Sequence, residues 1–193
     1  MQPIFLAVED SECCQRQMCG SAREFTMFIK TSTGQDILMM HRPFKCQLCA
    51  CCNLPELSSY FPNNTEVPIG KICADFDCCD DKFTIYDHNE MPIMSVHGDC
   101  CQMGKFCHFP CEGFDTIHYS ILNTASGQEG AVDKKFSSFT RELLSDADNF
   151  IVVFPPNSTL NERVLVLSST FLIDFMYFEK DSNDKQDNNF SIN

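Results

Sequence analysis

The chain has few basic residues for its length, with 14 lysines and arginines against 27 aspartates and glutamates among 193 residues. Its formal net charge of −13 opposes binding to the phosphates of nucleic acids and to anionic lipid surfaces. We therefore expect no nucleic-acid partner. A membrane partner would need a source of attraction other than the charge of the whole chain.

The N-terminal segment lacks the pattern of a secretory signal peptide. Residues 1–8 are largely apolar but carry no basic flank, and Glu9 and Asp10 interrupt the run before a signal core is complete. We expect a protein that is made in the cytosol and not secreted.

Recognisable catalytic motifs are also missing. The sequence contains no Gly-x-Ser-x-Gly, no His-Glu-x-x-His and no glycine-rich loop for phosphate. The five histidines are scattered along the chain at His41, His88, His97, His108 and His118. We expect no classical catalytic centre.

The first two thirds of the chain has the pattern of antiparallel β-structure, with short runs rich in Phe, Ile, Thr and Val between polar turns. Three hairpins are predicted, which pair 24–30 with 36–41, 82–86 with 93–96, and 116–122 with 130–136. Repeated hairpins at this spacing indicate a meander that forms a sandwich or a barrel.

A helix is predicted to follow, because Thr159 and Glu162 have the spacing of a capping box. Residues 164–178 are apolar on almost every side, which for a helix means burial in a core or a membrane. A bilayer crossing needs about 20 apolar residues. This run is shorter, and a central Asp174 would cost about 2.5 to 3.5 kcal/mol on insertion. These features favour a core helix over a membrane span.

Fourteen cysteines occur, mostly in clusters. An even count and glycosylation sequons at Asn63, Asn157 and Asn189 are compatible with a secreted disulfide framework. Without an export signal, the vicinal pairs are instead expected to be thiols, metal ligands or acylation sites in a reducing cytosol.

Several short stretches follow one another in a distinctive order: 9–14, 42–46, 67–70, 146–150 and 171–179. Together they resemble the phospholipid scramblase family over most of the chain. The resemblance implies a mostly β, Tubby-like fold, an antiparallel β-barrel that encloses a central hydrophobic helix. It assigns residues 1–179 to the barrel domain and 160–179 to its helix. The polar residues 180–193 are predicted to be a disordered acidic tail.

Departures from the family pattern lie near the N-terminus, where the Pro-rich arm and the first strands have no counterpart before Ile4. A barrel without its opening strands would expose backbone edges, through which the chain could form an oligomer.

A cluster of cysteines follows residue 45. The resemblance implies that it is palmitoylated at Cys46, Cys49, Cys51 and Cys52. Two or more acyl chains give stable membrane binding, which would offset the unfavourable charge. Zinc is the less favoured alternative, since Cys46 and Cys49 have the spacing of a ligand pair. The remaining ligands could then come from His97, Cys100, Cys101, Cys107, His108 or Cys111.

The resemblance also implies an EF-hand-like calcium segment. Loop positions 1, 3, 5, 7 and 12 fall on Asp146, Asp148, Phe150, Val152 and Asn157. Only two of these side chains are carboxylates, and the closing amide cannot bind an ion as a bidentate carboxylate does. We therefore expect a weak Ca²⁺ site. The alternative is that the two aspartates merely begin a turn into an apolar strand.

The resemblance implies a calcium-linked protein at the cytosolic face of the plasma membrane or an endomembrane, which moves phospholipids in both directions without ATP. One alternative is an acylated adaptor that binds signalling proteins or lipids without moving them. Another is a single-pass membrane protein.

Overall fold

The computed structural model describes residues 4–10, 23–45, 53–102, 116–135, 149–178 and 189–192, the last four by their backbone alone. These residues form one α-helix and the strands of one 11-stranded sheet. In chain order the elements are β1 (Phe5–Asp10), β2 (Phe25–Thr31), β3 (Asp36–Arg42), β4 (Glu56–Tyr60), β5 (Gly70–Asp75), β6 (Asp81–Asp87), β7 (Pro92–Gly98), β8 (Thr116–Asn123), β9 (Glu129–Lys135), β10 (Asn149–Val153), α4 (Leu160–Tyr177) and β11 (Asn189–Ile192).

The sheet is an antiparallel meander in which β1 to β10 each pair with their neighbours in sequence, while β11 adds to the outer side of β1. The three predicted hairpins are confirmed as β2–β3, β6–β7 and β8–β9. The predicted hairpins did not include strands β1, β4 and β5. In β4 the sequence Glu-Leu-Ser-Ser-Tyr has too few apolar residues to show a clear alternation.

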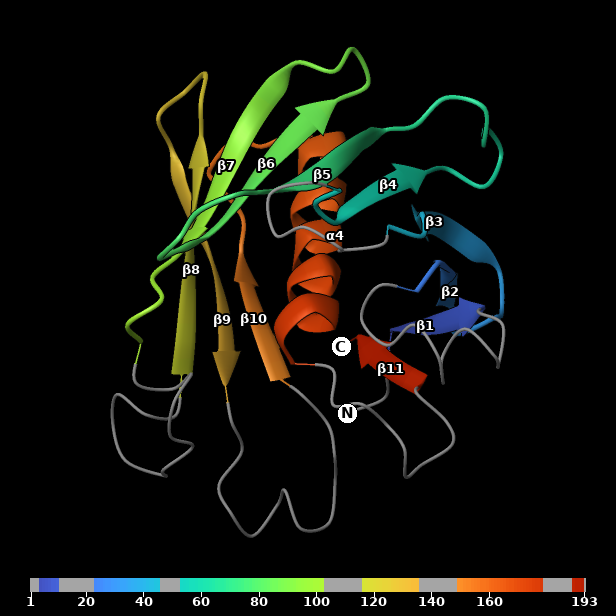
Figure 1. The fold of residues 1–193 in the computed structure, drawn as a ribbon. Coiled ribbons are helices and arrows are strands. Elements are labelled where there is room, and N and C mark those ends of the chain that lie inside the picture. Colours follow the sequence, from blue (N-terminus) through green and yellow to red (C-terminus); the bar gives the residue numbers. More distant parts are fainter. Residues whose placement is uncertain are drawn as a thin grey trace, which may run out of the picture.

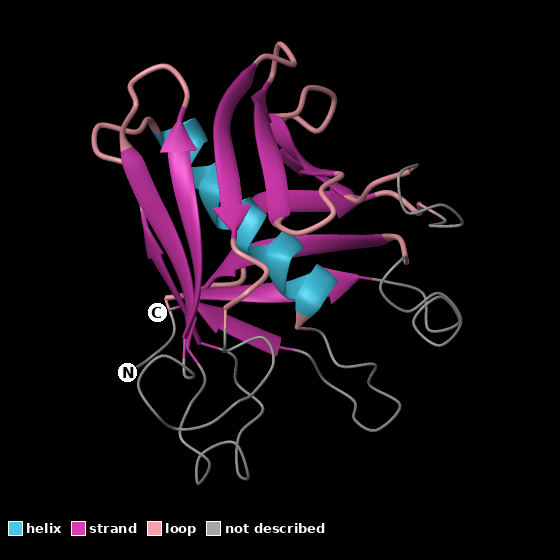
Figure 2. Ribbon diagram, turned by 60° about the vertical axis from the view of Figure 1, so that its left-hand side comes forward, coloured by secondary structure: helices cyan, strands magenta, loops and turns pink. Residues whose placement is uncertain are grey.

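The sheet curls around α4, so that the helix stands inside it (Figures 1 and 2). This confirms the predicted mostly β fold with one C-terminal helix. The strand order is linear, however, with β10 and β11 at its two ends. Within the described residues the curled sheet is therefore not closed into a ring by hydrogen bonds.

The core lies between the concave face of the sheet and α4. Strand β8 shows how it forms: alternate side chains, among them Ile117, Tyr119 and Ile121, are fully buried, while those between them face outward. The helix supplies Leu165, Val166, Leu172, Ile173 and Phe175 to the same core. The prediction of a core helix is confirmed. In the described part of the chain no helix combines the length and apolarity needed to cross a bilayer.

The predicted capping box starts α4. The Thr159 hydroxyl accepts a hydrogen bond from the Glu162 backbone N–H at 3.3 Å, and the Glu162 carboxylate accepts one from the Thr159 N–H at 2.6 Å. These two bonds satisfy backbone donors that the first turn of a helix leaves unpaired.

Strand β11 lies within the stretch that composition predicts to be disordered. Its backbone pairs with β1 from Phe5↔Ile192 to Val8↔Asn189. The structure differs from the prediction at these four residues because an edge strand offers backbone donors and acceptors whatever the side chains of its partner. The rest of the tail, residues 180–188 and 193, lies outside the described residues.

Candidate functional site

Most of the cysteines belong to connections that leave the same end of the sheet. Strands β1, β3, β5 and β7 run in the same direction, because each alternate strand of an antiparallel sheet does. The connections that leave their C-terminal ends are 11–24, 43–55, 76–80 and 99–115, and these carry thirteen of the fourteen cysteines. Cys73 lies in β5 itself. We call this end of the sheet the thiol end.

The predicted acylation sites belong to one of these connections, and all four lie outside the described residues: Cys46, Cys49, Cys51 and Cys52. The chain on either side is described. Lys45 Nζ lies 2.9 Å from Glu56 Oε2, so the residues just before and just after this stretch are joined by an ion pair. The described residues on both sides of this stretch therefore lie at the thiol end.

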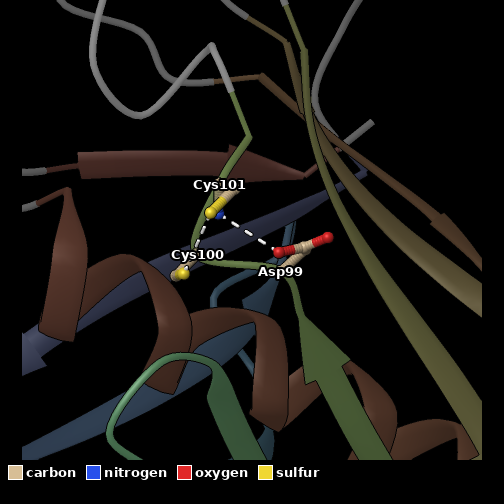
Figure 3. Close-up of side chains that lie close together, drawn as sticks. All are labelled: Asp99, Cys100 and Cys101. Carbon is tan, nitrogen blue, oxygen red and sulfur yellow. Dashed lines mark hydrogen bonds between the residues drawn. The ribbon is translucent and has the colours of Figure 1, made fainter.

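Asp99, Cys100 and Cys101 form a compact group at the same end (Figure 3). One carboxylate oxygen and the two sulfur atoms all lie within 4.8 Å of one another. Cys100 Sγ is 3.5 Å from Cys101 Sγ, and the Cys101 backbone N–H donates to Asp99 Oδ1 at 3.1 Å. Three potential metal ligands are therefore held together by a single turn of chain.

The residue before this group explains its position. Gly98 is the last residue of β7, opposite Asp81. A Cβ atom at Gly98 would lie only 2.3 Å from Cε1 of Tyr119, so the Tyr119 ring requires glycine there. The Tyr119 hydroxyl donates to Asp81 Oδ2 at 3.1 Å. This packing fixes the point at which the chain leaves the sheet and turns into residues 99–101.

A second turn, residues 76–80, is held against the first by Asp80. Its Oδ1 accepts a hydrogen bond from the Cys100 backbone N–H at 3.4 Å, and its Oδ2 lies 3.1 Å from His97 Nε2. The hydrogen bond to His97 is the main reason that the pKa of Asp80 is lowered. The carboxylate of Asp80 therefore connects the turn with Cys78 and Cys79 to the turn with Cys100 and Cys101.

The Asp80 carboxylate and two further thiols lie near Cys100. Its pKa is raised to about 11, first by the hydrogen bond with Cys101, then by partial desolvation and by the charges of Cys101, Asp80 and Cys79. The nearby Lys82 ammonium is engaged elsewhere, since Nζ lies 2.5 Å from Asp77 Oδ2 and holds the pKa of Asp77 at about 2. A cation would be favoured close to the two sulfur atoms.

The predicted calcium segment is only partly described. Phe150 and Val152 belong to β10 and are half-buried, with the Phe150 ring centroid 6.2 Å from that of Phe178. Strand β10 runs from the thiol end to the opposite end, where Asn157, with φ of 57°, precedes α4. Asn157 thus follows the C-terminal end of β10, whereas Phe150 lies near its N-terminal end. Asp146 and Asp148 lie outside the described residues.

Sequence reasoning named Cys100, Cys101 and His97 only as partners for a zinc pair at Cys46 and Cys49. Asp99 was not among these candidates, although the local turn of residues 99–101 places it beside both thiols. The available signal was an Asp-Cys-Cys run that directly follows a predicted strand. The other zinc candidates, Cys107, His108 and Cys111, lie outside the described residues.

Fold and site together define a class of protein in which a curled antiparallel sheet encloses a C-terminal helix and carries a cysteine-rich end. The chain belongs to the scramblase family, since the family model described as Scramblase matches residues 1–180. The resemblance noted in the sequence is thereby confirmed.

Curated relatives agree with this family. Phospholipid scramblase 1 of Mus musculus is 33% identical over 189 residues, which cover 96% of this chain and 54% of that protein. Phospholipid scramblase 2 of Homo sapiens is 31% identical over 183 residues, covering 93% and 58%. Phospholipid scramblase family member 5 of Homo sapiens is 31% identical over 179 residues, covering 92% and 63%. The chain thus spans little more than half the length of the first of these relatives. No solved structure matches it.

Proposed function

We propose that this protein associates with membranes and moves phospholipids between the two leaflets, in both directions and without ATP. The observation that carries this proposal is the family match over residues 1–180, which includes β1 to β10 and all of α4. The relatives that cover the same residues are named phospholipid scramblases.

The proposed attachment is an acyl anchor on the cytosolic face. Helix α4 places its apolar side chains inside the sheet, and Phe171, Leu172, Ile173 and Phe175 are all buried there. This surface is not available to lipid while the domain stays folded. Acyl chains on the cysteines at 46, 49, 51 and 52 would provide an apolar contact with the lipid that the buried side chains of α4 cannot make. Two such chains suffice for stable anchoring.

Calcium is proposed to act at the same end of the sheet. Asp146 and Asp148 belong to the connection from β9 to β10, which also leaves from the thiol end. A chain with a net charge of −13 is repelled by anionic headgroups, and a bound divalent cation reverses the local sign of that interaction. We propose these two carboxylates as ligands of a weak site, without closure by Asn157.

Reconstitution into liposomes tests the function directly. The acylated full chain would be inserted into vesicles with fluorescent lipid in both leaflets, and reductant would bleach the outer leaflet during a calcium titration. We expect bleaching to proceed beyond the outer-leaflet fraction as calcium rises, and to stop at that fraction for Asp146→Asn/Asp148→Asn. Bleaching that stays at the outer-leaflet fraction for the wild type at all calcium concentrations would exclude lipid movement by this chain.

An adaptor role is the second candidate, and the edge of the sheet favours it. Strand β10 ends the described strand order, and its Ile151 and Val153 side chains are 44% and 53% exposed. Such an edge can accept a strand from a signalling protein or from a second copy of this chain. Light scattering of the wild type and of Ile151→Lys would detect pairing with a second copy of this chain. A mass that is monomeric in both would exclude self-association through this edge.

A further inference from the structure

The sulfur and oxygen atoms of Asp99, Cys100 and Cys101 have the spacing of ligands that share one metal ion. Two thiolates on a tetrahedral zinc ion, each bonded at about 2.3 Å, lie about 3.8 Å apart. Cys100 Sγ and Cys101 Sγ are 3.5 Å apart, and one Asp99 oxygen lies within 4.8 Å of both. The three ligand atoms could close on an ion with small side-chain rotations, because Asp99 and Cys101 are exposed.

A fourth ligand is available across the β6–β7 hairpin. The ladder ends at Asp81↔Gly98, and Cys79 and Cys100 each lie two residues beyond this last pair, in the two turns that leave the same end of the hairpin. Asp80 holds the two turns together through the Cys100 backbone N–H. Cys79 precedes Asp80 in the chain and its side chain is exposed, so its thiol is free to rotate towards the group.

We propose that Cys79, Asp99, Cys100 and Cys101 form a zinc site that fastens the 76–80 turn to the 99–102 turn. Three sulfur ligands and one oxygen suit zinc, whereas calcium takes six to eight oxygen ligands. The site is therefore separate from the calcium proposed at Asp146 and Asp148. It does not depend on lipid movement, and it differs from the zinc set that sequence reasoning built around Cys46 and Cys49.

The first experiment measures zinc binding to the reduced full chain by competition with a chromogenic chelator. Cys100→Ser/Cys101→Ser should bind one equivalent less than the wild type, and Cys51→Ser/Cys52→Ser should not lose this equivalent. Asp99→Asn and Cys79→Ser should each weaken it on the order of tenfold or more. Cys78→Ser, an exposed neighbour outside the proposed set, should leave it unchanged.

Cobalt provides a spectroscopic readout of the same site. Tetrahedral Co²⁺ with thiolate ligands gives visible d–d bands and a sulfur-to-metal charge-transfer band. We expect Cys100→Ser/Cys101→Ser to reduce both bands, and Cys78→Ser to leave them intact. Equal zinc stoichiometry and equal cobalt spectra for the wild type and Cys100→Ser/Cys101→Ser would overturn the proposal.

A second measurement needs no variant, so it stands even if a substitution disturbs folding. Peptide mass spectrometry would follow alkylation of each thiol by N-ethylmaleimide with and without zinc. Zinc should protect Cys79, Cys100 and Cys101 by at least tenfold in rate, with Cys78 as the internal control. Equal protection of Cys78, no protection of Cys100, or a disulfide that blocks these thiols before zinc is added would each overturn the site.

Discussion

Lys134 on β9 and Asp174 on α4 form an ion pair inside the protein, with Nζ 3.5 Å from Oδ1 and side chains 1% and 6% exposed. The Lys134 ammonium also lies 3.7 Å from the ring centroid of Phe178 and 5.1 Å from that of Phe150. The charge that argues against a membrane span is thus compensated within the core. The pair joins α4 to β9 within the core.

Lys134→Met should destabilise the protein by about 3–5 kcal/mol, because it leaves the buried Asp174 carboxylate without this cation. Lys134→Met/Asp174→Leu should recover part of that loss, since both charges are then gone. Urea unfolding of the two single variants and the double variant measures the coupling. Lys71→Met is the matched control: its ion pair with Glu90, at 2.6 Å, is solvent-exposed and should contribute little to stability. Equal costs for Lys134→Met and Lys71→Met would contradict the buried pair.

Phe175→Ala should cost about 3–5 kcal/mol, because the side chain is 2% exposed and packs 4.4 Å from the ring centroid of Phe25. Leu160→Ala on the same helix is the control, since Leu160 is exposed and should change stability by less than about 0.5 kcal/mol. Thermal unfolding would compare the two. A similar small effect for both would mean that the sheet does not enclose α4.

The turn between β6 and β7 should make stability depend on pH. Asp87 accepts hydrogen bonds from the Met91 and Asn89 backbone N–H groups, both at 2.9 Å, and these lower its pKa from the ordinary value of 3.8. A lowered folded-state pKa contributes stability above the unfolded value, and this contribution is lost as pH falls from about 4 through the folded pKa. The wild type should therefore exceed Asp87→Asn in stability at neutral pH, and the difference should shrink below about pH 4. Glu66→Gln removes one carboxylate from an exposed loop and controls for the change in net charge. If the stability difference between the wild type and Asp87→Asn did not vary with pH, the proposed role of Asp87 would be contradicted.

Calcium binding should disappear in Asp146→Asn/Asp148→Asn and remain unchanged in Asn157→Asp. The second expectation follows from β10: the two aspartates precede this five-residue strand in the chain and Asn157 follows it, and the strand itself is about 13 Å long. Calorimetry with calcium would compare both variants with the wild type. Tighter binding by Asn157→Asp would show that the segment closes as an EF-hand loop.

Membrane attachment in cells should be lost after hydroxylamine, which cleaves thioesters, and in Cys46→Ala/Cys49→Ala/Cys51→Ala/Cys52→Ala. The reason is the need for at least two acyl chains on an acidic protein. Membrane fractionation would measure it, with Cys13→Ala/Cys14→Ala as a control outside the cluster. A quadruple variant that stays fully membrane-bound would rule out this cluster as the anchor.

Local patterns in the sequence determined the hairpins and the start of the helix. The alternation in residues 82–86 and 93–96 and the Thr159 to Glu162 capping box depend on neighbours within a few residues, so they can be predicted without knowledge of the fold. The apolar run with its central Asp174 also indicated a core helix. The order of the family's short stretches identified the scramblase family.

Tertiary structure decided which distant residues meet. Lys134 and Asp174 are 40 residues apart, and their contact requires the sheet to curl around α4. The hydrogen bond from the Cys100 backbone N–H to Asp80 depends on the register of one hairpin, and the point where the chain leaves β7 depends on a glycine that admits the Tyr119 ring. The pairing of β11 with β1 uses backbone groups, which no side-chain pattern reveals. Such contacts depend on strand register and sheet curvature, which are set by packing across the whole molecule and not by any one segment.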